Sequence, residues 1–266
     1  MTLVSTLRAF LIPALAAVAA FIASAAEATC LRLAGAPPLL QRAAFGLANV
    51  PAEQVRLTFV GHASFEIETA EGIRAVTDYN GYIRPARNPH IVTMNNSHST
   101  HFTDVIEPEI LLALRGWKND GVLRHNVVVK DLRVRNVPTN LYPIGGGLAH
   151  GNSIFVFESA NLCIAHISHV HHRLSDDQLL DLGLIDVALV AVDGTVTMTH
   201  RELFEALDKV KPRLIVPMHM ISMNAVNHFV ALAQTLYPVK HHESDTIMLD
   251  ARTLPHRPEV LFLKGR

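Results

Sequence analysis

Short apolar runs with a histidine at one end are the feature that most constrains this chain of 266 residues. The run Ile91–Met94 reads as a buried strand, and the segment 95–101 that follows it contains two histidines. The neutral imidazole ring is the commonest protein ligand for borderline-soft cations. Strand ends that meet at one rim of a sheet would bring five histidines together as a metal site: His98, His101, His150, His169 and His219.

The pattern of apolar and polar residues predicts an α/β fold with mixed sheets. Ser175 and Gln178 form one predicted capping box, at the start of a helix. Thr199 and Glu202 form another. Strands are predicted at 55–60, 65–68, 73–76, 91–94, 127–134, 154–157, 162–165, 187–192, 214–216, 246–249 and 260–263, and helices at 105–117, at 224–236 and after each capping box.

The first 25 residues are predicted to be a signal peptide. Arg8 supplies a positive n-region, residues 10–22 are apolar, and Ala23-Ser24-Ala25 offers a small-x-small cleavage site. An uncleaved N-terminal anchor is the alternative, although the apolar run is short for a membrane span. We therefore expect a periplasmic or secreted protein with a lead segment at 26–54 and one domain at 55–266.

Charge and cysteine content limit the functions to consider. The net charge is −1 and no basic block occurs, so the sequence gives no sign of nucleic-acid binding or of membrane binding beyond the export signal. Cys163 lies in an apolar run and is most simply a buried thiol, and a disulfide to Cys30 is the alternative in an oxidising compartment. A small-molecule substrate is the expected partner, and the oligomeric state is left open.

The order of the motifs resembles the metallo-β-lactamase fold superfamily, and within it the branch of metal-dependent hydrolases that includes the ascorbate-6-phosphate lactonases. The motifs run in the family's order over residues 55–219: Gly-His-Ala-Ser at 61–64, the His-rich loop at 95–101, His-Gly-Asn-Ser at 150–153, Val-Asp-Gly at 192–194 and Pro-Met-His at 217–219. The resemblance implies an αββα sandwich of two mixed sheets flanked by helices, with metal at one sheet edge.

The resemblance also implies which residues bind metal, with departures. The family loop His-x-His-x-Asp-His falls on residues 96–101, where Asn96 and Thr100 replace a histidine and the aspartate. The bridging aspartate of the family corresponds to His169. The remaining family histidines match the chain at His98, His101, His150 and His219.

Five histidines without a carboxylate would not offset the charge of two cations, so we expect one tightly held divalent metal. Zinc suits imidazole well, and manganese, iron or nickel are alternatives. Asp78, Asp104 and Asp193 could restore negative charge if they reach the site, and Asp193 beside Gly194 is the best placed of them. The residues expected to act on substrate are His62, Asp193 and His172. His171 and His172 begin the loop that follows His169.

These features favour a metal-dependent hydrolase in which metal-bound hydroxide attacks an ester, lactone or phosphodiester. A site of neutral ligands would keep positive charge, which favours an anionic substrate. The alternative is a non-catalytic secreted protein that binds metal or another ligand on the same fold. A protein that no longer needs catalysis would be expected to lose some of the usual ligand types, as this sequence has.

The export signal gives the first testable prediction. Protein recovered from the source cell should begin near Ala26, because the small-x-small site follows the apolar core directly. N-terminal sequencing measures this. Recovery of an intact Met1 form in the membrane fraction would instead indicate an anchor.

Overall fold

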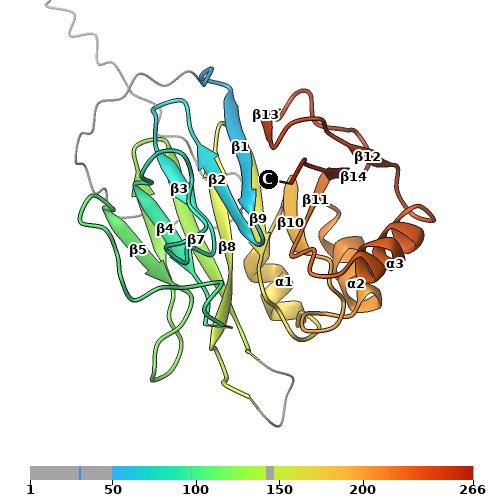
Figure 1. Cartoon of the computed structure of the whole chain (residues 1–266), viewed down its shortest axis with the longest axis horizontal. Helices are drawn as coiled ribbons and strands as arrows, with labels where there is room; N and C mark the ends of the chain where they lie inside the picture. The colour runs from blue at the N-terminus through green and yellow to red at the C-terminus, as the bar shows by residue number, and fades with distance from the viewer. Residues whose placement is uncertain (1–29, 31–49, 97, 142–146, 266) are drawn as a thin grey trace, which may run out of the picture.

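In the computed structural model, which describes residues 30, 50–96, 98–141 and 147–265, two mixed β-sheets pack face to face and three helices lie beside one of them (Figure 1). No helix in this described part of the chain is long and apolar enough to cross a bilayer. The predicted signal peptide and most of the lead segment lie outside the described residues, so the domain boundaries stay predictions.

The first sheet has the strand order β13-β1-β2-β3-β4-β5. Its strands β1 to β3 pair antiparallel, and β3, β4 and β5 pair parallel. The C-terminal strand β13 pairs with β1, so the end of the domain is tied to its beginning. The bounds are β1 Gln54–Gly61, β2 Ser64–Glu68, β3 Arg74–Val76, β4 Ile91–Met94, β5 Leu112–Arg115 and β13 Thr246–Asp250.

The second sheet has the order β12-β14-β11-β10-β9-β8-β7-β6. Its strands from β12 to β9 pair parallel, and those from β9 to β6 pair antiparallel. The bounds are β6 Asn126–Val129, β7 Leu132–Thr139, β8 Asn152–Ser159, β9 Leu162–Ile167, β10 Val187–Ala191, β11 Leu214–Met218, β12 Val239–His241 and β14 Glu259–Phe262.

Alternating side chains form the core between the sheets. On β2, Phe65 and Ile67 are fully buried in the cluster that joins the two sheets. Glu66 and Glu68 of the same strand point to the opposite face, as the two-residue period of a strand requires. Burial of each large apolar side chain contributes about 1.5–3 kcal/mol to folding. This packing holds the strand ends in place.

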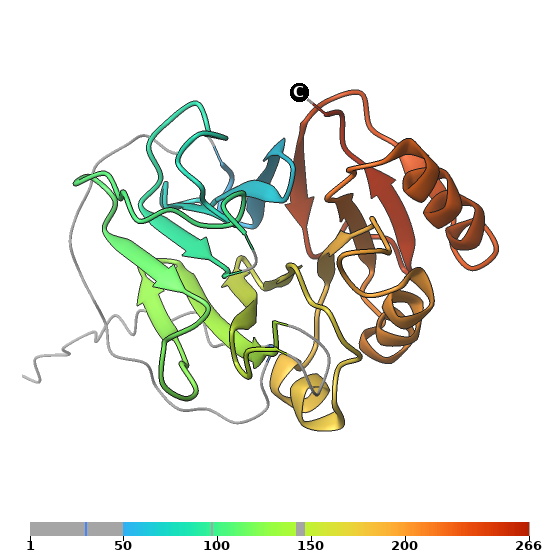
Figure 2. The same cartoon turned by 60° about the horizontal axis from the view of Figure 1, so that its bottom comes forward.

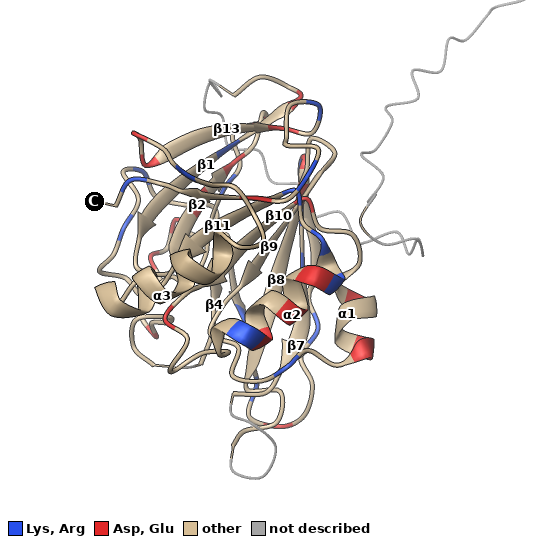
Figure 3. Cartoon of the chain, turned by 90° about the vertical axis from the view of Figure 1, so that its right-hand side faces the viewer, with Lys and Arg blue, Asp and Glu red and all other residues tan. Residues whose placement is uncertain are grey.

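The three described helices cover the outer face of the second sheet: α1 (Asp176–Leu182), α2 (His200–Val210) and α3 (Met223–Ala233). Both predicted capping boxes are confirmed, because Ser175 and Thr199 each accept a hydrogen bond from the expected N3 backbone. Charged residues lie on α1 and α2, whereas α3 has none (Figure 3).

The predicted α/β fold of two mixed sheets with helices is confirmed, with one difference in detail. The outer face of the first sheet is covered by loops and not by any helix of the described residues. Its apolar part, which includes Val92 and Met94, packs against Tyr79, Ile110 and Trp117 from those loops.

Two local predictions are wrong. The helix expected at 105–117 is a loop followed by β5, because this stretch completes the sheet edge by pairing with β4. The apolar residues of this stretch cover the sheet although the chain that carries them is extended and not helical. The single strand expected at 127–134 is the hairpin β6–β7, which turns tightly at Lys130, where φ is 52°.

The ends of several strands from both sheets meet at one edge of the sandwich. Strands β4, β9, β10 and β11 each continue into a loop that carries a predicted site residue. Loops from the two sheets come together at this edge, which Figure 2 turns toward the reader. The fold thus gathers residues that lie more than a hundred positions apart in the sequence.

A disulfide joins Cys30 to Cys163 on β9, across 133 residues of chain and with 6.1 Å between the Cα atoms. Of the two states left open by the sequence, the structure therefore has the bonded one. The backbone carbonyl of Cys30 also accepts a hydrogen bond from the amide of Leu184. Both cysteines are buried in the cluster under the helices, so the bond fastens the lead segment to the second sheet.

Loss of this disulfide should destabilise the domain. A crosslink that closes so long a loop lowers the entropy of the unfolded chain, and its removal costs roughly 3–5 kcal/mol. Urea unfolding of Cys30→Ala and of Cys163→Ala should show equal losses, because either change breaks the same bond. A reductant should lower the free energy of unfolding of the wild type to the same value as in the two variants. Unchanged wild-type stability under reductant would contradict this role.

Candidate metal centre

Four histidines from distant loops come together between the sheets. One ring nitrogen from each of His98, His101, His169 and His219 lies within 4.8 Å of the others, and such a group could hold a metal ion. His98 and His101 follow β4, His169 follows β9 and His219 follows β11. His98 is exposed to solvent while the other three are buried, so the group is open on one side.

His101 is held by a buried carboxylate. Its Nδ1 donates to Oδ2 of Asp78 at 2.6 Å. Asp78 follows β3 and also accepts hydrogen bonds from Ser168 and Asn95. Burial alone would raise the pKa of Asp78, but its interactions with His101 and with its other partners lower that pKa below the usual range. The carboxylate is therefore ionised and fixes the orientation of the His101 ring.

His219 is held in the same way from the second sheet. Its Nδ1 donates to Oδ1 of Asp193 at 2.8 Å. The Asp193 carboxylate also accepts from the backbone and hydroxyl groups of Thr195 and Thr197 in its own loop. Burial alone would raise the pKa of Asp193, and these hydrogen bonds lower it below the usual range. Asp193 thus orients His219 through a hydrogen bond.

The free nitrogens of these two rings suit a cation. The Nε2 atoms of His101 and His219 are buried and have no hydrogen-bond partner. Since each Nδ1 carries the proton donated to an aspartate, each Nε2 presents a lone pair. A buried acceptor without a partner is costly in a folded protein. Carboxylate–histidine–metal arrangements resolve this cost and are the usual way that proteins orient metal ligands.

The remaining pair, His98 and His169, has the spacing of two ligands of one ion. Their Nε2 atoms are 3.3 Å apart. Two nitrogens bound to one tetrahedral zinc at 2.0–2.1 Å are separated by about 3.3 Å. Burial and neighbouring histidines lower the pKa of His169 to about 2, so its ring is neutral and able to bind metal at neutral pH. The four-histidine group therefore fits a divalent cation.

His62 lies beside this group and is linked to it by a hydroxyl. Its ring centroid is 4.4 Å from that of His219. Thr100 Oγ1 lies 3.1 Å from Nε2 of His62 and 2.7 Å from Nδ1 of His98. Burial, then the neighbouring histidines, lower the pKa of His62 to about 4, which leaves the ring neutral at neutral pH. His62 thus presents a neutral ring nitrogen to the Thr100 hydroxyl beside the group.

Backbone strain also concentrates here. His62, Asp78 and His219 have positive φ angles of 53°, 43° and 57°. Non-glycine residues rarely adopt this conformation. It occurs where the interactions of a functional site stabilise it against its steric cost. Gly194, with φ of 63°, follows Asp193 in a turn where a Cβ would lie 2.5 Å from Nε2 of His200. Glycine lets this loop bring Asp193 to His219.

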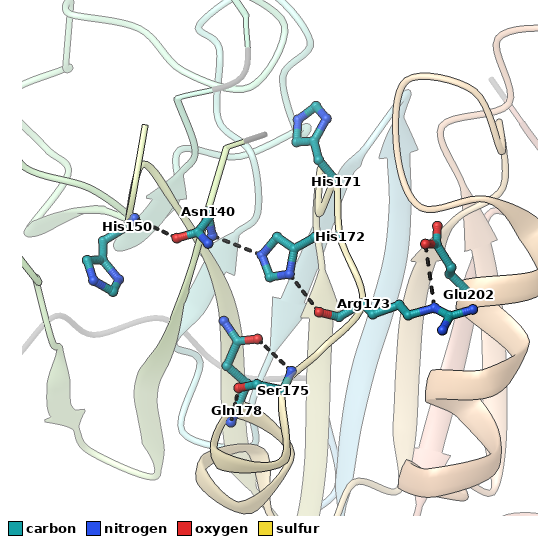
Figure 4. A pocket seen from close by; sticks show the side chains of 8 residues that line it. All are labelled: Asn140, His150, His171, His172, Arg173, Ser175, Gln178 and Glu202. Atoms are coloured by element: carbon teal, nitrogen blue, oxygen red, sulfur yellow. Dashed lines mark hydrogen bonds and ion pairs between the residues drawn. The ribbon is translucent and has the colours of Figure 1, made fainter. Parts of the chain in front are cut away.

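The structure does not bring His150 into the group, contrary to the prediction. Its backbone, with φ of 56°, is held by a hydrogen bond from its amide to Oδ1 of Asn140. His150 faces a separate cavity of about 530 Å³, where its Nδ1 is buried without a partner (Figure 4). His171, whose Nε2 is 2.9 Å from Nδ1 of His169, lies between this cavity and the group.

Two other predicted residues take positions that differ from those expected. His172 lines the same cavity, but its Nε2 accepts from the amide of Asn140 and its Nδ1 donates to the carbonyl of Arg173 (Figure 4). Both ring nitrogens are engaged, which gives His172 a role in holding the loop. Asp104 lies on the surface and pairs with Arg115.

Sequence reasoning missed how Asp78 would be used. The sequence indicates Asp78 only as one of three carboxylates that could restore negative charge, with no sign of its partner. The signals that could have found it are Asn95 and Ser168, two polar residues each placed directly after an apolar strand. Both are buried, and both donate to Asp78.

The fold and the site together define a two-sheet α/β protein with a candidate metal centre at the sheet edge. A family model described as the beta-lactamase superfamily domain matches residues 56–219, more than half of the chain. The chain therefore belongs to the metallo-β-lactamase superfamily.

Among the relatives, the UPF0173 metal-dependent hydrolase of Pyrococcus furiosus is 24% identical over 189 residues, 62% of this chain and 84% of that protein. Its counterpart from Thermococcus kodakarensis is 28% identical over 191 residues, with the same shares covered.

Solved structures agree on the fold. A Thermotoga maritima protein described as a Zn-dependent hydrolase of the superfamily aligns with a TM-score of 0.59 and 24% identity, over 80% of this chain and all of that one. CmlA, a diiron β-hydroxylase from Streptomyces venezuelae, aligns with a TM-score of 0.52 and 12% identity, over 75% of this chain and 54% of its own. The second likeness indicates that the fold alone does not decide the reaction.

Removal of the charge behind His219 should weaken metal binding. Asp193→Asn leaves the ring in place but loses the ionised acceptor, and we expect about 10–100-fold lower zinc affinity in competition with a chelating dye. Asp104→Asn is the matched control, since its carboxylate is on the surface. Equal zinc affinity in Asp193→Asn and the control would show that the hydrogen bond does not tune the site.

Proposed function

We propose that this protein is a metal-dependent hydrolase with one tightly held divalent metal, zinc being the first choice. The observation that supports it most is the pair of buried Nε2 atoms on His101 and His219, each without a partner and each backed by an aspartate. The relatives named metal-dependent hydrolases support the reaction class. When bound, such a metal lowers the pKa of a coordinated water and polarises the substrate oxygen.

The residues of the chain itself would then hold and orient the ligands. Asp78 and Asp193 keep the His101 and His219 rings in the tautomer that presents Nε2. Thr100 connects His98 to Nε2 of His62, so that the neutral His62 ring orients the Thr100 hydroxyl beside His98. Asp193, first expected to act on substrate, is assigned here to position His219.

An ester or lactone is the substrate class that we favour, with a phosphodiester as the alternative. The earlier expectation of an anionic substrate assumed a site without carboxylates. Asp78 and Asp193 lie one hydrogen bond behind the ligands and offset the charge of a divalent ion. The attraction for an anion is accordingly weaker than neutral ligands alone would give.

We also propose that the protein works outside the cytoplasm. The Cys30–Cys163 disulfide supports this, because structural disulfides persist in oxidising compartments. It agrees with the signal peptide expected at residues 1–25.

The proposal predicts that metal content and hydrolysis depend on the same histidines. The mature protein should bind about one equivalent of zinc and hydrolyse at least one of p-nitrophenyl acetate, a γ-lactone and bis-p-nitrophenyl phosphate. His219→Ala should lower zinc content and lower turnover by about 100-fold or more, because it removes a ligand. His256→Ala, a change at an exposed histidine, is the control and should match the wild type.

Elemental analysis after dialysis, together with initial rates, measures both quantities. Full turnover by the metal-stripped protein would contradict metal dependence. Bound zinc with no turnover of any of the three substrates would favour the non-catalytic metal-binding alternative.

A further inference from the structure

The loops around the four-histidine group have an unusual composition. Although 18% of the chain is charged, none of the following segments contains Lys, Arg, Asp or Glu: 79–83, 95–103, 147–153, 168–172, 194–200 and 219–229. The turns at the opposite edge of the sheets differ, since they carry Glu71, Lys130, Asp131, Asp186 and Lys211. The segments around the candidate metal centre therefore lack charge themselves, and the buried carboxylates of Asp78 and Asp193 adjoin two of them.

Several of these uncharged loops expose large apolar side chains to solvent. Val196 is 47% exposed, Ile221 is 52% exposed and Met223 is 70% exposed. Tyr82 and Leu148 are exposed on two further loops. Single exposed apolar residues are ordinary on protein surfaces. What distinguishes these is that they lie in or next to the loops that carry the residues of the site.

Hydrogen bonds tie the residues that carry these side chains to the group, through backbone amides for Val196 and Ile221 and through the hydroxyl for Tyr82. The amide of Val196 donates to Asp193, whose carboxylate holds His219. The amide of Ile221 donates to the carbonyl of His219 itself. The hydroxyl of Tyr82 donates to the carbonyl of Ser99, next to His98.

The loops that carry Val196 and Met223 also lie side by side. His200, at the start of α2, has its Nδ1 3.0 Å from Nδ1 of His228 on α3. Its ring also lies against Phe229, with the centroids 5.7 Å apart. The two segments are therefore neighbours, and we refer to their exposed side chains Val196, Ile221 and Met223 together as the apolar strip.

The arginines that directly follow these segments offer little to an anion. Arg84 pairs with Glu107, and both Arg173 and Arg201 pair with Glu205. These carboxylates neutralise the three guanidinium groups. With an uncharged rim, the surroundings of the group favour an apolar ligand.

We propose that the substrate of this hydrolase is a neutral ester or lactone that carries an apolar chain, and that this chain lies on the apolar strip. The inference rests on the proposed function and names its substrate class. The reacting carbonyl would sit at the four histidines while the chain runs over Val196, Ile221 and Met223. In the free protein the apolar strip is in contact with water, and a bound chain would displace that water. A longer chain buries more apolar surface and therefore binds more tightly.

A chain-length series tests this on the zinc-loaded protein. We expect kcat/KM for p-nitrophenyl octanoate to exceed that for p-nitrophenyl acetate by about tenfold or more, with both esters below their micellar concentrations. In the variant with Val196→Ser, Ile221→Ser and Met223→Ser together, the octanoate-to-acetate ratio should fall about tenfold. The matched control carries Leu180→Ser, Leu236→Ser and Met248→Ser, three exposed apolar residues away from the site, and should keep the wild-type ratio.

A second measurement needs neither metal nor turnover. The neutral dye N-phenyl-1-naphthylamine becomes fluorescent on apolar surfaces, and its fluorescence should rise with the wild type and the control but much less with the strip variant. Equal fluorescence with all three proteins would overturn the proposal.

The remaining outcomes separate the two claims. No hydrolysis of any ester or lactone, with dye binding lost in the strip variant, would reject the proposed function while the strip still binds apolar ligands. Hydrolysis of acetate and octanoate at equal rates would overturn the substrate class and leave the hydrolase intact. Equal rates together with sedimentation of the wild type, but not the strip variant, on phosphatidylcholine vesicles would assign the strip to a lipid surface instead.

Discussion

Two aspartates buried behind the histidines determine how this edge of the sandwich is built. Asp78 comes from the first sheet and Asp193 from the second, and each accepts a hydrogen bond from the Nδ1 of one histidine. A buried carboxylate is tolerated only where donors surround it. Ser168, Asn95 and the Asp193 loop supply those donors from several strand ends. The site is therefore assembled only when both sheets are packed together.

The position of these carboxylates also explains the charge of the site. In the superfamily, aspartates stand at the positions of Thr100 and His169, so the resemblance led us to expect a site without carboxylates. The structure has carboxylates one hydrogen bond farther away, where they orient the ligands and offset the charge of one cation. A second cation would need a further negatively charged ligand, and the four-histidine group contains none. The same near-neutral balance agrees with the uncharged segments of these loops, which expose apolar side chains.

The sequence predicted the parts of this account that depend on strand periodicity. Buried runs such as Leu214–Met218 are evident from their apolar residues, and the histidines that follow them reach the site because parallel strands end at one edge. The helix expected at 105–117 was wrong because its apolar side chains cover a sheet from an extended chain. His150 was misplaced because its loop is fixed by Asn140, a contact between side chain and backbone that leaves no periodic signal. The sequence left the disulfide open because the residues on either side of Cys30 carry no periodic pattern.

The central claim is that one cation is held by four histidines while the two aspartates stay behind them. Anomalous diffraction from crystals of the zinc-loaded protein tests it most directly. The account predicts one peak, about 2.0–2.1 Å from ring nitrogens of His98, His101, His169 and His219. A second peak of equal occupancy about 3.5–4 Å from the first, or an oxygen of Asp78 bound directly to the metal, would contradict it.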